Sequence, residues 1–133
     1  MRIHISRDLA HPLRHTIAIG PHTLAADVSV DEGGEDSAPS PHDLYDAALG
    51  ACKALTVAWY ARRKGIPVEQ IEVWVERDAS QERAGLYKLA TTLSLGGALS
   101  DMQRQALLAA AQKCPVHKLM SSVRTEISTE LAP

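Results

Sequence analysis

The sequence has no surplus of positive charge. Its 14 lysine and arginine residues and 16 aspartate and glutamate residues give a formal net charge of −2. Proteins that bind duplex nucleic acid usually carry a basic surplus that displaces counterions from the phosphates. The one basic run, Arg62-Arg63-Lys64, is better explained as favourable charge at the C-terminus of a helix. We therefore expect no nucleic-acid partner.

Long apolar runs are also missing. No uninterrupted apolar stretch reaches the roughly 20 residues that a helix needs to span a bilayer. Residues 1–6 lack the apolar segment of a signal peptide. These absences lead us to expect a cytoplasmic protein without a membrane partner.

Cysteine is scarce, with only two in the chain. In a reducing compartment two cysteines rarely form a permanent structural disulfide. The remaining composition is ordinary, since 45% of the 133 residues are hydrophobic and 23% are charged. No repeat or low-complexity tract is visible, so we expect a single domain over residues 1–133.

Apolar residues alternate with period two or repeat at helical spacing along the chain. Pro115 should end or bend the helix that we predict over residues 101–113. The expected order is strands, a long helix, strands, a helix and a strand, which indicates an α+β fold with a mostly antiparallel sheet. The predicted strands cover residues 3–5, 17–19, 24–28, 71–75, 86–95 and 123–129, and the predicted helices cover residues 41–64, 101–113 and 116–120.

The long helix has clear signals at both ends. Ser40 is a typical N-cap, Pro41 suits the first helical position, and Asp43 supplies an acid at the third. At the other end, three cations precede Gly65, with Pro67 close behind. Such a helix would be about 36 Å long at 1.5 Å per residue.

The middle of this helix, residues 47–60, is apolar on most faces. Only Lys53 and Thr56 are clearly polar there. A helix that is apolar nearly all round must be buried nearly all round. A chain of this size would struggle to cover it alone, so the pattern predicts a homodimer whose interface includes part of the helix.

The two thiols are the candidates for chemistry. Cys52 lies inside the long helix, and Cys114 lies at the end of the later helix in Lys113-Cys114-Pro115-Val116-His117. Considered alone, each cysteine is explained most simply as a small core residue. A metal site of Cys52, Cys114 and His117 is a further alternative, although one Cys-x-x-His pair supplies at most half of a four-ligand zinc shell. The third alternative is redox chemistry.

Three segments of the chain, taken in order, form a specific set of motifs. The first runs from Gly34 through Ser40-Pro41-His42-Asp43-Leu44-Tyr45 to Ala48-Leu49-Gly50-Ala51-Cys52. The second is Tyr60-Ala61-Arg62-Arg63-Lys64-Gly65-Ile66-Pro67. The third is Leu99-Ser100-Asp101-Met102-Gln103-Arg104, followed by Lys113-Cys114-Pro115-Val116-His117. Together these segments resemble the OsmC/Ohr family of osmotically inducible and organic hydroperoxide resistance proteins. The resemblance spans roughly residues 13–131.

The resemblance implies an OsmC-like fold: an intertwined α+β homodimer with a long central helix and two active sites at the subunit interface. It implies a thiol-dependent peroxidase that needs no cofactor and no metal. Cys52 would attack a small-molecule peroxide, Cys114 would resolve the sulfenic acid as a disulfide, and an external dithiol would reduce that disulfide. An arginine from an N-terminal strand and an acid near the start of the central helix would support the thiol, and Arg14 and Asp43 are the matching candidates.

One position departs from the family pattern. The organic-hydroperoxide branch has glutamate ten residues before the first cysteine, where this chain has His42. Asp43, nine residues before, matches the acid of other branches and is also explained by the cap of the helix. The departure favours an alternative to the peroxidase, a non-catalytic protein of the same fold that binds a small apolar or thiol-reactive ligand. A redox sensor, whose disulfide would change its shape or its binding, is a third alternative.

Overall fold

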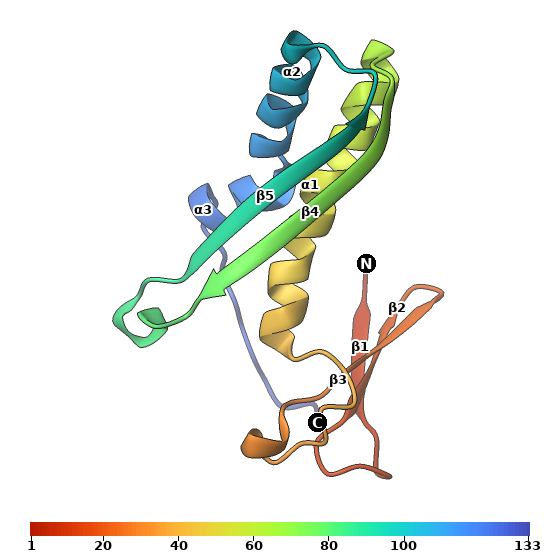
Figure 1. Ribbon diagram of the computed structural model, residues 1–133. Helices are drawn as coiled ribbons and strands as arrows, with labels where there is room; N and C mark the ends of the chain where they lie inside the picture. Colours follow the sequence, from red (N-terminus) through yellow and green to blue (C-terminus); the bar gives the residue numbers. More distant parts are fainter. The chain divides into compact units, whose positions relative to one another are not determined.

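A computed structural model describes residues 1–133 and has an α+β fold with antiparallel sheets (Figure 1). By its internal contacts the chain divides into two compact units, residues 1–47 and 48–133, which are described in turn. The single domain expected over residues 1–133 stays a prediction. The elements are β1 (Ile3–Arg7), β2 (His15–Ile19), β3 (His22–Ala26), α1 (Pro41–Lys64), β4 (Val68–Asp78), β5 (Lys88–Gly97), α2 (Asp101–Gln112) and α3 (Pro115–Ser122), with short 3-10 turns η1 (Val30–Glu32) and η2 (Glu82–Ala84).

The first unit contains a three-stranded antiparallel sheet in the order β1-β2-β3. Apolar residues meet across it, because Ile17 in the central strand pairs with Ile5 on one side and Leu24 on the other. Ile17 is the buried member of the three. The period-two alternation in the sequence therefore corresponds to cross-strand packing on one face of the sheet.

The loop after β3 is organised by a buried carboxylate. Asp27 accepts hydrogen bonds from the N–H groups of Val28 (2.8 Å), Glu35 (3.3 Å) and Ser37 (3.1 Å), and from the Ser37 hydroxyl (2.6 Å). Hydrogen bonds from the Ser37 hydroxyl and then its N–H hold the pKa of Asp27 well below its usual range. The segment that leads to α1 is thus tied to the end of β3.

The start of α1 is a reciprocal cap. The N–H of Asp43 donates to the Ser40 hydroxyl at 3.1 Å, and the N–H of Ser40 donates to the Asp43 carboxylate at 3.0 Å. Each side chain therefore satisfies a backbone donor that the helix cannot. The helix ends at Lys64, and Gly65 follows with a φ of +65°, which glycine adopts without strain. The predicted bounds of this helix are confirmed.

In the second unit, the hairpin of β4 and β5 packs with α1 and α2 around one core (Figure 1). The core centres on Val57 and Ala61 of α1 and on Leu107 and Ala111 of α2. Val57 and Leu107 have no exposed surface, and full burial of such a side chain contributes about 1.5–3 kcal/mol. Partly buried hydrophobic residues from the hairpin and its flanks complete the core: Tyr60, Ile66, Val68, Ile71, Leu93, Leu95 and Leu99.

Close packing between α1 and β4 depends on a small residue two positions before Cys52. A Cβ atom placed on Gly50 would lie 2.8 Å from Cγ2 of Val75, which is shorter than real Cβ contacts. Any larger residue would push the helix away from the strand. Gly50 therefore sets how near the Cys52 segment lies to the hairpin.

The last predicted strand, residues 123–129, is wrong. Residues 123–133 follow α3 without regular structure, and Ile127 and Leu131 are almost fully exposed. Alternation alone does not make a strand, because the N–H and C=O groups of a strand need a neighbouring strand.

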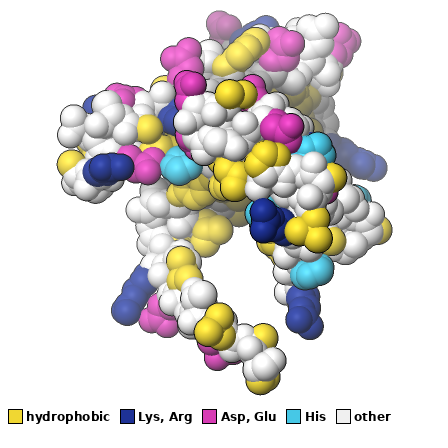
Figure 2. Space-filling model, turned by 90° about the horizontal axis from the view of Figure 1, so that it is seen from below, with side chains coloured by type: hydrophobic (Ala, Val, Ile, Leu, Met, Phe, Trp, Pro, Cys, Tyr) yellow, Lys and Arg dark blue, Asp and Glu magenta, His cyan; other side chains and the backbone are white.

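The face of the molecule in Figure 2 shows hydrophobic side chains at the surface among interspersed acidic and basic ones. None of the helices has the length and apolar character that crossing a membrane requires.

Candidate active site

The sulfur of Cys52 lies against the first turn of α3. Cys52 is half-buried in the middle of α1, and its Sγ accepts a hydrogen bond from the backbone N–H of Val116 at 3.5 Å. Val116 is the second residue of α3, so its N–H has no partner within that helix. A thiolate at Cys52 would thus be stabilised by a backbone donor and by the positive end of the helix dipole.

The second thiol lies at the same helix end. Cys114 is the N-cap of α3, and its Sγ accepts the backbone N–H of His117 at 3.4 Å. Pro115 occupies the first helical position, where its missing N–H costs nothing. The Cys-Pro-Val-His sequence therefore forms a helix start that presents N–H groups to both sulfurs.

The two thiols also contact each other and are not joined in a disulfide. Burial raises the pKa of the Cys114 thiol above its ordinary value, and the hydrogen bond with Cys52 raises it further. The His117 N–H and the positive charge of Lys53 act in the opposite direction. Cys114 thus favours the protonated thiol, which can donate to the Cys52 sulfur.

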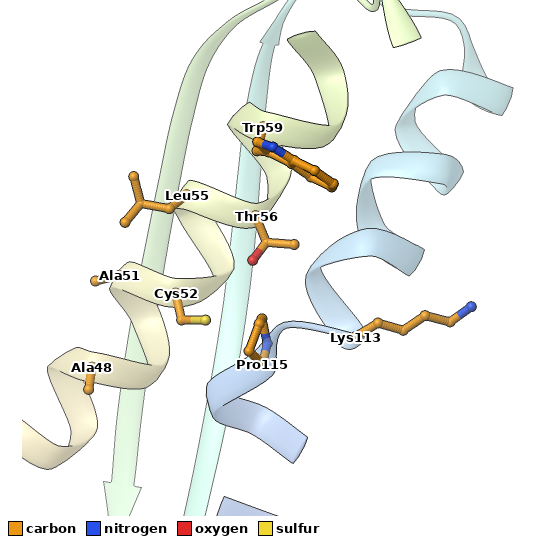
Figure 3. A pocket seen from close by; sticks show the side chains of 8 residues that line it. All are labelled: Ala48, Ala51, Cys52, Leu55, Thr56, Trp59, Lys113 and Pro115. Atoms are coloured by element: carbon orange, nitrogen blue, oxygen red, sulfur yellow. The ribbon is translucent and has the colours of Figure 1, made fainter. Parts of the chain in front are cut away.

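An apolar pocket opens beside Cys52 (Figure 3). It has a volume of about 640 Å³ and is lined mostly by side chains of α1. Figure 3 shows the Cys52 sulfur pointing toward Pro115, with Thr56 and Trp59 farther along the same helix. The residues that line the pocket are Ala48, Ala51, Cys52, Leu55, Thr56, Trp59, Lys113 and Pro115.

A buried cation lies behind the thiols. Lys53 is only 5% exposed, and its Nζ donates to the carbonyl oxygen of Ala111 and to Nδ1 of His117, both at 2.9 Å. His117 itself is exposed. The Lys53–His117 pair therefore links a buried ammonium to the solvent. Lys53 directly follows Cys52 in the sequence.

The structure brings the thiols of Cys52 and Cys114 together. Their roles as attacking and resolving thiol stay predictions. The two other candidates belong to the first unit. Arg14 donates through Nη1 to the carbonyl oxygen and the hydroxyl of Ser37, at 2.7 and 3.0 Å. Asp43 caps α1. The supporting roles of Arg14 and Asp43 at the thiol stay predictions.

The alternative of a metal site finds no matching arrangement. No group of three or more His, Cys, Asp or Glu side chains is placed to hold a metal ion. His117, the third ligand considered, has its Nδ1 engaged with Lys53 instead. Both cysteines are free thiols.

A family model described as OsmC-like protein matches residues 34–130, which include the capped start of α1 and both thiols. The chain belongs to the OsmC-like family. No curated protein gives a significant match. The pattern of a helix thiol followed by Lys-Cys-Pro-Val-His is thus part of a family domain.

Solved structures share the OsmC-like fold with this chain. An OsmC-like protein from Mycoplasma pneumoniae has a TM-score of 0.72 at 16% identity, over 92% of this chain and 87% of its own. An organic hydroperoxide resistance protein OsmC from Legionella pneumophila has a TM-score of 0.62 at 23% identity, over 91% and 88%. The organic hydroperoxide resistance protein OhrB of Bacillus subtilis has a TM-score of 0.59 at 22% identity, over 91% and 90%.

Two parts of this OsmC-like site could not be found by motif reasoning. The Val116 N–H belongs to the backbone, so no residue type reveals it. Lys53 had a usable signal, because it is a charged residue in a segment that is otherwise apolar on most faces. Such a residue must either reach solvent or find buried acceptors, and Lys53 does the second.

Proposed function

We propose that this OsmC-like protein is a thiol-dependent peroxidase that reduces organic hydroperoxides, and hydrogen peroxide more slowly, through Cys52 and Cys114. The observation that carries the proposal is the placement of both sulfurs at the N-terminus of α3, in contact with each other and beside an apolar pocket. The membership in a family that includes organic hydroperoxide resistance proteins supports it.

In the first step the Cys52 thiolate attacks the outer oxygen of the hydroperoxide. A sulfur–oxygen bond forms, the oxygen–oxygen bond breaks, and the alkoxide leaves as the alcohol after taking a proton. Cys52 becomes a sulfenic acid. The Val116 N–H, 3.5 Å from Sγ, stabilises the thiolate before the attack.

Ionisation of the thiol supplies only part of the rate. A free cysteine has a pKa near 8.5, so a few per cent is thiolate at pH 7. Lowering such a pKa to about 6 requires some 3.4 kcal/mol and raises the thiolate fraction about thirtyfold. Part of that gain is lost, because a less basic thiolate is a weaker nucleophile. Orientation of the peroxide and stabilisation of the departing alkoxide must therefore supply the rest.

In the second step the Cys114 sulfur attacks the sulfenic sulfur of Cys52. The disulfide forms, the sulfur–oxygen bond breaks, and hydroxide leaves as water with the proton that Cys114 gives up. The hydrogen bond between the two thiols supports this step, because the attacking sulfur already lies next to the sulfur that it attacks. An external dithiol then reduces the disulfide and restores both thiols.

The pocket beside Cys52 favours an organic substrate. Apart from Thr56 and Lys113, its lining side chains are apolar or sulfur-bearing. An alkyl tail would bury apolar surface there at roughly 25 cal/mol per Å². Hydrogen peroxide has no such surface to bury.

The test is dithiothreitol-dependent consumption of cumene hydroperoxide and of hydrogen peroxide at pH 7. We expect repeated turnover and a second-order rate constant at least about tenfold higher for cumene hydroperoxide, corresponding to some 1.4 kcal/mol of tail binding. Trp59→Ala, which removes the largest apolar wall of the pocket, should narrow this ratio. Equal constants for the two peroxides would contradict the organic preference, and absence of turnover would overturn the proposal.

The same assay separates the peroxidase from its alternatives. The histidine at position 42, where the hydroperoxide branch has glutamate, favours a protein that binds a ligand in the pocket without turnover. A binder would not consume peroxide repeatedly, and a redox sensor would react once and change its affinity for a partner. Turnover over many equivalents of peroxide excludes both.

We further propose that the protein works as a homodimer. Along α1 the side chains of Ala51, Leu55, Ala58 and Trp59 form an exposed apolar stripe, with Leu55 70% and Trp59 58% exposed. Covering this stripe with a second copy would remove apolar surface from water. Light scattering at micromolar concentration should give about twice the mass of the 14.4 kDa chain. A monomer with this stripe in water would refute the dimer.

A further inference from the structure

Lys53 is a buried cation with no carboxylate among its hydrogen-bond partners. Its Nζ donates to the Ala111 carbonyl oxygen and to His117 Nδ1. As long as Lys53 is an ammonium, Nδ1 must hold a lone pair to accept this bond, so the His117 ring is then neutral. Both partners are thus uncharged. A buried charge is costly unless an opposite charge is near.

The group nearby that can supply the opposite charge is Cys114. The positive charge of Lys53 acts on the Cys114 thiol and lowers its pKa, against the larger effect of burial. The two are also linked through one residue, because the His117 backbone N–H donates to Cys114 Sγ and its ring accepts from Lys53. The groups that act on Cys114 are the thiol of Cys52 and the ammonium of Lys53 from α1, and the backbone N–H of His117 from α3.

We propose that Lys53, held by His117, is the positioning residue for disulfide formation: its ammonium stabilises the Cys114 thiolate that attacks the Cys52 sulfenic acid. The inference rests on the proposed function, since it concerns the second step of that reaction. Lys53 acts through Cys114 and takes no part in bond making.

This role explains why the cation is buried beside a buried thiol. Cys114 has no exposed surface, so water cannot stabilise its thiolate. For Cys114 to attack, its proton must leave, and the sulfur must carry a negative charge in a site with few donors. Lys53 supplies the positive charge, and the proton released by Cys114 leaves with the hydroxide as water.

A small cavity lies next to Lys53. This second cavity has a volume of about 120 Å³, which has room for a few water molecules. Polar side chains of Thr91, Thr92 and Gln112 contribute to its wall.

The first experiment measures the thiolate of Cys114 without any peroxide. In a Cys52→Ser background, ultraviolet absorbance near 240 nm is followed from about pH 6 to about pH 11.5, because burial raises the pKa of Cys114 above its ordinary value. We expect Lys53→Met to raise the titration midpoint by about one pH unit, a tenfold loss of thiolate at a given pH. Lys118→Met, the same substitution at an exposed lysine of α3, should leave the midpoint unchanged. An unchanged midpoint in Lys53→Met would overturn the inference.

The second experiment follows the disulfide in the protein with both cysteines. After one equivalent of cumene hydroperoxide, we expect Lys53→Met to form the Cys52–Cys114 disulfide about tenfold more slowly at pH 7. Oxidation of the Cys52 thiol to the sulfenic acid should proceed at the wild-type rate. The rate of disulfide formation should also shift to higher pH, which a merely structural role would not produce. Unaltered disulfide kinetics would count against Lys53.

A further variant protects the test against a failure of Lys53→Met to fold. His117→Ala changes an exposed residue and frees Lys53 from its anchor, so it should move the Cys114 midpoint in the same direction by a smaller amount. If wild type forms no sulfenic acid, the proposed function fails, yet the titration still decides whether Lys53 controls Cys114. The two failures are therefore distinguishable.

Discussion

Replacing Cys52 by serine is expected to reduce dithiothreitol-dependent peroxide consumption by at least about 10³-fold, because enzymes that lose a covalent nucleophile lose several orders of magnitude in rate. A serine hydroxyl at pH 7 is almost entirely protonated and is a poor nucleophile toward oxygen. The backbone donor at Val116 and the apolar pocket would remain, but neither can attack a peroxide. The measurement is the initial rate with cumene hydroperoxide at pH 7.

The fold should survive this change. Cys52 is half-buried, and serine is close to it in size, so we expect a small shift in the melting temperature and an unchanged circular dichroism spectrum. Cys114→Ser serves as the matched control, because it makes the same replacement at the other thiol. A Cys52→Ser variant that keeps more than a tenth of the wild-type rate would show that the nucleophile is elsewhere.

The parts of the fold that were predictable are those with local causes. The bounds of α1 follow from a cap at Ser40 and Asp43 and from a glycine at the end, and these signals depend on a few neighbouring residues. The start of α2 has a local cause of the same kind, a capping box in which Ser100 and Gln103 cap each other's backbone N–H groups. Hydrogen bonds between near neighbours in the chain do not require knowledge of the rest of the molecule.

The predicted strand at residues 123–129 failed because its cause would have been non-local. Val123 and Ile127 have the alternation of a strand, but within this chain the segment pairs with no other strand. Its apolar side chains consequently remain exposed. A pattern can state which faces of a segment are apolar, but it cannot supply the neighbouring strand.

The candidate site shows the same division. The sequence identifies Cys52 and Cys114 as candidate thiols. Their contact, however, depends on tertiary packing between α1 and the start of α3. Lys53 was read only as a polar interruption of an apolar helix. Its burial depends on a carbonyl oxygen 58 residues later and on a ring 64 residues later. No local pattern contains such partners.

Replacing Cys114 by serine is expected to convert a durable catalyst into one that inactivates within a few turnovers. Without the resolving thiol, the Cys52 sulfenic acid waits for dithiothreitol to reach it through the pocket. A second hydroperoxide molecule competes for the same sulfur and oxidises it to sulfinic acid, which the dithiol cannot reduce. The first turnover should be nearly normal, because Cys114 takes no part in the attack on the peroxide.

This expectation separates the roles of the two thiols in one experiment. Intact-protein mass spectrometry after several equivalents of cumene hydroperoxide should find two added oxygen atoms on Cys52 in the Cys114→Ser variant, and an intramolecular disulfide in wild type. Raising the ratio of hydroperoxide to dithiothreitol should speed the inactivation of the variant far more than that of wild type, because only in the variant do the two reagents compete for an open sulfenic acid. A variant that keeps a linear progress curve and an unmodified Cys52 would mean that Cys114, despite its contact with Cys52, protects nothing. The buried thiol would then be a core residue, and the reaction would depend on Cys52 alone.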